Sequence, residues 1–185
     1  MNRAAPWAIG AALVLAAGAA VALTPPDIAL SQAFYLRGGV GDAVTGRTLV
    51  AQVRDASFAE RVTAGGGDWD ADGNWLVVTV AASAPQTEVD AAVIIAAMQI
   101  GDRTFHASER ARDSLLGAAL RVGTDTVGML AFELPADVDA GDAELRLITS
   151  YSTPQLDDVV VLPLSLDELP SKTEIEITPP EWEGF

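Results

Sequence analysis

Three aspartates at alternate positions form the sharpest chemical signal in the sequence. The run from Asp68 to Gly73 reads D-W-D-A-D-G, and carboxylates at this spacing, followed by a glycine that permits a turn, can surround Ca²⁺ with oxygen ligands. An EF-hand loop needs a glutamate at its twelfth position, and Thr79 stands there instead. The run therefore predicts either a solvated turn or a weak calcium site formed by Asp68, Asp70 and Asp72, and we expect no other cofactor.

Other residues with catalytic chemistry lack the partners that this chemistry requires. His106 is the single histidine, and no G-x-S-x-G turn presents Ser108 or Ser114 as a nucleophile for it. Asp157 and Asp158 are adjacent, and adjacent residues of a strand point to opposite faces of a sheet. We therefore predict that the protein is not an enzyme, and a carboxylate-dependent envelope hydrolase is the least favoured alternative.

The acidic, proline-containing segment 167–185 carries two aromatic residues that suit partner binding. Trp182 and Phe185 lie among glutamates, and large rings supply much of the anchoring energy in short-motif recognition. Prolines prevent a regular helix there, so we expect a mobile tail whose aromatic residues are either a docking motif or incidental. The alternating stretch TEIEIT, residues 173–178, favours another interpretation, an additional edge strand.

Charge and composition exclude several classes of function. The 26 acidic residues against 11 Lys and Arg give a net charge of −15, which repels phosphate backbones and excludes nucleic acid as a partner. The chain has no Cys, which excludes a disulfide framework, thiolate catalysis, iron–sulfur clusters and the usual structural zinc sites. The length is that of one ordinary domain with additional segments.

Residues 1–23 predict a membrane anchor or a signal peptide. The apolar run Trp7 to Leu23 spans roughly 26 Å as a helix, near the low end for a bilayer core of about 30 Å. Arg3 precedes this run and Arg37 is the first positive residue after it, so the N-terminus is expected in the cytoplasm and the rest outside the cell membrane. The small-x-small sequence ending at Ala22 gives the alternative, cleavage near Ala22 followed by secretion.

The remaining chain has the pattern of short strands separated by turns. Residues 24–45 are read as a linker and residues 46–166 as a β-sandwich domain. Residues 75–82 are apolar on both faces, which predicts a central strand that is covered on each side. The pair Gly101-Asp102 predicts a tight hairpin turn. The strands are expected at 46–53, 58–63, 75–82, 93–100, 103–106, 127–134, 143–149 and 159–166.

This series of strands, with no convincing amphipathic helix, predicts an all-β fold. We expect an antiparallel sandwich that is preceded in the chain by one N-terminal helix. Trp75 and Phe132, each flanked by apolar strand residues, are the expected aromatic anchors of its core.

Three strand motifs carry a family resemblance. They read D-G-N-W-L-V-V-T-V from Asp72, I-G-D-R-T-F-H-A-S from Ile100 and T-V-G-M-L-A-F-E-L-P from Thr126. Their order resembles that of the immunoglobulin-like, immunoprotective-antigen-like domains of unknown function in secreted or membrane-anchored proteins of Gram-positive, actinobacterial-type bacteria. The resemblance covers about residues 46–166 and departs from the family where Asp102 precedes Arg103. It implies an exported immunoglobulin-like β-sandwich without known catalytic residues.

The function predicted from the sequence is that of a non-enzymatic, extracytoplasmic interaction module. Its N-terminal helix tethers it to the membrane, and its partner is an envelope protein or polymer. The alternative is a calcium-stabilised, adhesion-like domain that uses the loop from Asp68 to Gly73.

Overall fold

The computed structural model describes residues 33–149 and 157–183, together with residues 10, 12–14 and 17. The chain divides into two compact units, Met1–Gln32 and Ala33–Phe185. Most of segment 1–23 lies outside the described residues, and with it the predictions of an anchor and of cleavage near Ala22. Among the residues that are described, no helix is long and apolar enough to cross a membrane.

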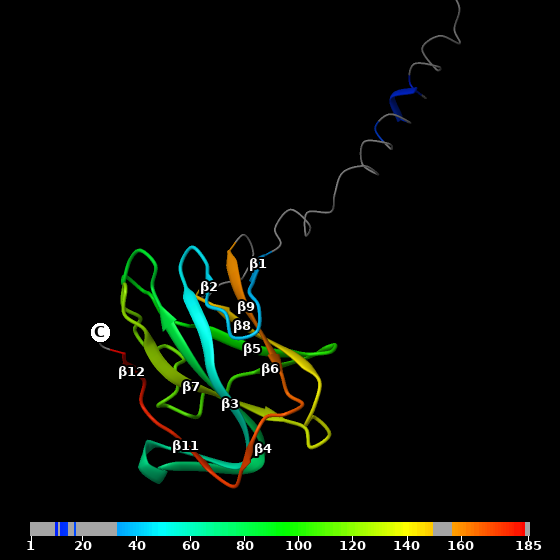
Figure 1. Ribbon diagram of the computed structural model, residues 1–185. Helices are drawn as coiled ribbons and strands as arrows, with labels where there is room; N and C mark the ends of the chain where they lie inside the picture. The colour runs from blue at the N-terminus through cyan, green and yellow to red at the C-terminus, as the bar shows by residue number, and fades with distance from the viewer. Residues whose placement is uncertain (1–9, 11, 15–16, 18–32, 150–156, 184–185) are drawn as a thin grey trace, which may run out of the picture. The chain divides into compact units, whose positions relative to one another are not determined.

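The second unit is built from two β-sheets, as the alternating sequence pattern predicts (Figure 1). Sheet A has the order β1-β9-β8-β5-β6, with the bounds β1 Phe34–Arg37, β9 Asp158–Ser165, β8 Asp142–Ile148, β5 Ile95–Ile100 and β6 Arg103–His106. Sheet B has the order β10-β3-β4-β7-β12, and its strands are β10 Ser171–Lys172, β3 Val50–Ala64, β4 Trp69–Ser83, β7 Thr126–Leu134 and β12 Glu181–Trp182. Two more strands pair with β3, namely β2 Val44–Thr45 and β11 Ile175–Ile177, and the short 3₁₀ turn η1, Gly65–Gly67, joins β3 to β4.

The all-β prediction is confirmed, and the central strands pair in antiparallel fashion. The predicted hairpin at Gly101 is present: β5 and β6 pair directly, and Gly101 has φ 58°, a conformation that glycine adopts without strain. The sheets are antiparallel as predicted except at their edges, where β1 runs parallel to β9 while β10 and β11 run parallel to β3. All of these parallel pairs are made by segments near the two ends of the second unit.

Alternate residues of both sheets form the core between them. In sheet B, Leu76 and Val78 of β4 and Phe132 of β7 belong to this core, and in sheet A, Leu145 and Leu147 of β8 do. Side chains of a strand alternate between faces, so each sheet presents one apolar face to the other. Phe132 is fully buried here, as its flanking residues predict.

A second apolar layer covers the other face of sheet B. Trp75 and Val77 of β4 point into it together with Ala131 and Ile177, and the ring of Trp69 meets that of Trp75 edge-on at a centroid distance of 6.0 Å. A register shift in β3 between Ala59 and Arg61 marks a bulge, and beyond it β3 contributes to this layer. Strand β4 is therefore covered on both sides, as residues 75–82 predict, and Trp75 is buried in the outer layer rather than between the sheets.

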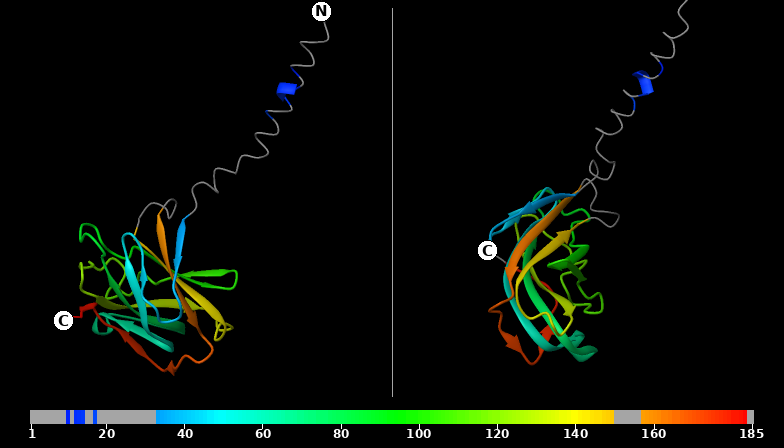
Figure 2. Two further views of the ribbon diagram at one scale, coloured as in Figure 1. Left: turned by 45° about the horizontal axis from the view of Figure 1, so that its top comes forward. Right: turned by 90° about the vertical axis from the view of Figure 1, so that its right-hand side faces the viewer.

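The acidic C-terminal segment is part of the sandwich and not a mobile tail. Strands β10 and β11 extend the β3 edge of sheet B, and β12 pairs with β7 on its other side. Ile177 is 1% exposed within the outer layer. Pro180 packs against Gly128 so closely that a Cβ atom added to this glycine would lie 3.1 Å from the proline ring. The segment can be followed from β9 past β11 to β12 in Figures 1 and 2, and the edge-strand interpretation of residues 173–178 is confirmed.

The compact unit is therefore wider than the predicted domain 46–166. Strands β1 and β2 lie in the predicted linker 24–45, and β10 to β12 lie in the predicted tail 167–185. The physical reason is that edge strands and apolar faces gain stability when further chain covers them.

Removal of either buried ring tests this packing. We expect Phe132→Ala and Trp75→Ala to lower the free energy of unfolding by about 3 to 5 kcal/mol, because each leaves a cavity in a filled layer. Phe34→Ala is the matched control, since that ring is 58% exposed, and it should cost less than about 1 kcal/mol. Denaturant unfolding measures all three, and a buried-ring variant as stable as the control would contradict the packing.

Candidate functional site

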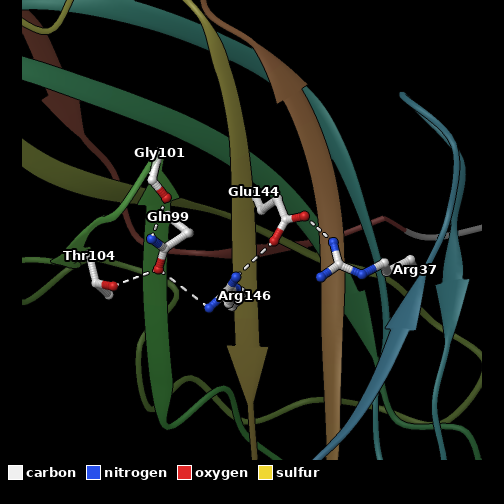
Figure 3. Close-up of polar contacts among 6 residues, drawn as sticks. All are labelled: Arg37, Gln99, Gly101, Thr104, Glu144 and Arg146. Atoms are coloured by element: carbon white, nitrogen blue, oxygen red, sulfur yellow. Dashed lines mark hydrogen bonds and ion pairs between the residues drawn. The ribbon is translucent and has the colours of Figure 1, made fainter.

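A continuous network of polar side chains crosses the outer face of sheet A (Figure 3). Glu144 and Arg146 lie on β8 and alternate with inward-facing leucines of the core. Because successive side chains of a strand point to opposite faces, both of these side chains lie on the outer face. Gln99 of β5, Thr104 of β6 and Arg37 of β1 complete the network.

Each member of the network is linked to the next by hydrogen bonds. The Thr104 hydroxyl donates to Gln99 Oε1 at 2.6 Å, and Arg146 Nη1 donates to the same oxygen at 3.4 Å. The Gln99 amide nitrogen donates to the carbonyl oxygen of Gly101 at 2.8 Å, which fixes the orientation of the amide. Arg146 Nη2 donates to Glu144 Oε2 at 2.9 Å, and Arg37 Nη1 donates to Glu144 Oε1.

The network rests on an apolar strip that belongs to the same face. Ile148, Val159 and Val161 are buried there, and Val161 is the register partner of both Arg37 and Arg146. Strand β9 contributes short apolar side chains between the charged strands, so Arg37 reaches across β9 to Glu144. The arginine stems thus cover apolar surface while the guanidinium groups remain at the surface.

An aromatic ring lies beside the two guanidinium groups. The centroid of the Tyr35 ring is 6.0 Å from the guanidinium carbon of Arg37 and 5.5 Å from that of Arg146. These distances permit cation–π attraction, which is strongest where water is partly excluded. Tyr35 is still 50% exposed, so much of its ring remains open to a ligand.

Electrostatics keep Glu144 in its carboxylate form. Its partial burial alone would raise the pKa, but hydrogen bonds from Arg146 and then Arg37, with the charges of both, outweigh burial and lower the pKa of Glu144. A general acid for glycoside hydrolysis needs a raised pKa instead. The arrangement suits binding: it offers fixed donors and acceptors beside an open aromatic ring.

Sequence reasoning did not identify this network. Glu144 and Arg146, two positions apart on one strand, are the signal that was available, because such residues share a face. Their partners are distant in sequence: Gln99 and Arg37 are separated from β8 by 47 and 107 positions. No local spacing rule connects residues so far apart.

The three aspartates of the predicted calcium site do not point into one loop. Asp68 follows the η1 turn, whereas Asp70 and Asp72 lie on β4 and share Arg61 of β3. Arg61 donates to Asp72 at 2.7 Å and to Asp70 at 2.5 Å, and the hydrogen bond to Asp72 together with the charge of Asp70 raises the pKa of Arg61. Within the described ranges, no group of three or more acidic or histidine side chains could hold a metal ion. A weak calcium site stays a prediction.

Trp182 is held on the sandwich and exposed to solvent. Strand β12 fixes its backbone against β7, and the Arg121 guanidinium lies 4.7 Å from the ring centroid. The side chain is 61% exposed, so it is an anchored aromatic residue rather than part of a mobile peptide. Phe185, the other predicted partner-binding residue, lies outside the described residues.

The remaining acidic pair has a structural role. Arg47 Nη2 donates to Asp157 at 2.7 Å, and the backbone N–H of Arg47 donates to Asp158 at 2.6 Å. These contacts tie the start of β9 to the turn before β3.

A hollow of about 800 Å³ lies beside the η1 turn. Asp68 and Trp69 line one side, and Arg110, Arg112 and Asp113 line another. Asp113 accepts a hydrogen bond from the N–H of Gly65 at 2.8 Å, so the turn and this loop are joined. The lining mixes both charges.

Neither a family model nor a curated protein matches the chain. Among solved structures, a Staphylococcus aureus subsp. aureus NCTC 8325 protein, provisionally named a lipoprotein, superposes with a TM-score of 0.44 and 11% identity. The alignment covers 73% of this chain and 94% of that one. A similarity of this size carries no argument about function, and the resemblance to immunoprotective-antigen-like domains stays a prediction.

The pH dependence of stability tests the environment of Glu144. A carboxyl with a lowered pKa in the folded protein contributes stability above its ordinary value of 4.5, and this stability is lost as the pH falls through the lower, folded value. We therefore expect Glu144→Gln to lower Tm at about pH 7 and to lower it less at about pH 3. A difference in Tm that is constant or grows toward acid would contradict the assignment.

Calcium titration tests the pairing of Arg61. We expect no micromolar calcium binding by the wild-type protein, because Arg61 forms ion pairs with two of the three carboxylates, Asp70 and Asp72. Arg61→Gln leaves Asp70 and Asp72 to repel each other, so calcium should bind this variant more tightly than wild type. Calorimetry measures both, and micromolar binding by wild type that disappears in Asp70→Asn would overturn this interpretation.

Proposed function

We propose that the protein is a non-enzymatic, extracytoplasmic module that contacts a component of the cell envelope through the outer face of sheet A. The observation that supports the proposal is the network of Thr104, Gln99, Arg146, Glu144 and Arg37 beside the exposed ring of Tyr35. Aromatic and arginine side chains are enriched where proteins bind partners. Their fixed orientation reduces the conformational entropy that binding costs.

The location proposed for the module rests on the N-terminal sequence. An apolar run between Arg3 and the acidic remainder of the chain suits a single-pass anchor with its N-terminus in the cytoplasm. Cleavage near Ala22 would release the module on the same side of the membrane. The immunoglobulin-like resemblance agrees with this location, and in both cases the sandwich faces the envelope.

Topology is the first test of this proposal. A reporter that is active only in the cytoplasm, fused after Phe185, should give no signal in intact cells. The same reporter fused to a chain that begins at Ala33 is the control and should be active. A strong signal from the full chain would contradict the extracytoplasmic location.

Binding to envelope material is the test of the surface. The purified unit, residues 33–185, should sediment with isolated envelope, and Tyr35→Ala and Arg37→Gln should each weaken this by about tenfold or more. Trp182→Ala is the matched control, because it removes an exposed aromatic residue from sheet B. Point variants are used instead of a deletion of residues 167–185, because that deletion would remove β10 to β12 and with them part of sheet B. Equal weakening by all three variants would contradict an assignment to sheet A.

A further inference from the structure

The polar network forms a line across the full width of sheet A. Thr104 lies on β6 and Gln99 on β5, the Glu144–Arg146 pair lies on β8, and Arg37 lies on β1 beyond β9. Neighbouring strands are about 4.8 Å apart, so the line extends over roughly 19 Å. A chain-like ligand that lies across the strands would meet each of these groups in turn.

The groups in this line both donate and accept hydrogen bonds. In the described chain, Nε and Nη2 of Arg37 have no hydrogen-bond acceptor, so they can donate to a ligand. The Glu144 oxygens accept, and the Thr104 hydroxyl and the Gln99 amide can do both. A sugar hydroxyl also donates and accepts, so neighbouring hydroxyl groups complement a guanidinium–carboxylate pair.

The aromatic ring adds apolar contact at one end of the line. Tyr35 is 50% exposed, and its register partner on the neighbouring strand is Val159, a buried residue of the apolar strip. An open aromatic face can pack against the C–H groups of a sugar ring while its hydroxyl group stays hydrated.

Charge decides which kind of polymer fits. The whole chain carries −15, so a polyanion is repelled by the surface around the site. The line as a whole holds two arginines against one glutamate, so a polycation meets a local excess of positive charge. An uncharged ligand avoids both penalties.

We propose that the outer face of sheet A binds an uncharged polysaccharide of the cell envelope, through Tyr35, Arg37, Glu144, Gln99 and Thr104. This inference rests on the proposed function and names the ligand class of the same surface. Sugar hydroxyls bind along the Thr104–Arg37 line, and one sugar ring packs on Tyr35.

The experiment uses polysaccharide from the envelope of the producing cells, divided by anion exchange into uncharged and acidic fractions and digested with protease. Wild-type unit 33–185 should bind the uncharged fraction, and its affinity should change less than about twofold between 0.05 and 0.5 M salt, because no ion pairs form. Periodate oxidation, which cleaves vicinal diols, should abolish binding.

Two variants separate the ring from the hydrogen bonds. Tyr35→Ala should weaken binding by about tenfold, and Thr104→Val, which removes one hydroxyl and keeps the side-chain shape, by about threefold to tenfold. Both positions are exposed, so Tm should stay close to that of wild type. Val89→Ser, at a residue that is 76% exposed between β4 and β5 and outside the polar network, should bind as wild type does.

The alternative results distinguish the two proposals. Binding to intact envelope that protease abolishes would leave the module function standing and overturn the polysaccharide ligand. Binding to the acidic fraction alone, weakened steeply by salt, would also overturn it. Absence of binding to any envelope material would contradict both proposals.

Discussion

The burial of both faces of β4 is the constraint on which the rest of the second unit depends. Leu76, Val78 and Val80 face the core between the sheets, while Trp75 and Val77 face the outer layer. A strand that is apolar on both sides is stable only when two layers cover it. The inter-sheet core provides one cover, and the outer layer, with Ile177 from the C-terminal segment, provides the other.

This constraint makes the two sheets unequal. The outer face of sheet B is occupied by Trp69, Trp75 and Ile177, together with the neighbouring segments that bury them. The outer face of sheet A keeps only a narrow apolar strip and carries Glu144, Arg146 and Gln99 on the rest. The exposed polar network thus lies on the sheet whose outer face is not needed for stability. A surface that does not have to be buried for stability can carry residues that serve binding.

The strands could be predicted from sequence because their signals are local. The alternating pattern predicts the bounds of β7 and β8 to within one residue. The apolar stretch 75–82 indicates the central strand, and the glycine at 101 indicates a hairpin. The C-terminal segment was misread as a mobile tail, since its acidic residues and prolines resemble disordered composition while Ile175 and Ile177 carry the packing. The composition of a segment averages over all of its residues, whereas its packing can depend on one or two buried side chains.

The candidate site could not be predicted for a different reason. Arg37, Glu144 and Gln99 meet only because β1 adds in parallel to β9 and β5 lies beside β8. Those pairings join segments about 50 to 120 positions apart, and no local pattern encodes them. In the aspartate run, Asp70 and Asp72 are both ion-paired with Arg61 on the neighbouring strand. Cross-strand partners, not spacing along the chain, decide which charged groups are available to bind.

The most direct test of the sheet A assignment is a map of the contact surface in solution. Backbone amide NMR shifts of the ¹⁵N-labelled unit 33–185 can be followed while soluble envelope polysaccharide is added. The sheet A assignment predicts that the largest shift changes occur at Tyr35, Arg37 and Thr104, with the amides of β12 and of the η1 turn unchanged. Changes centred on Trp182 or on Gly65–Gly67, with β1 and β6 unaffected, would contradict it.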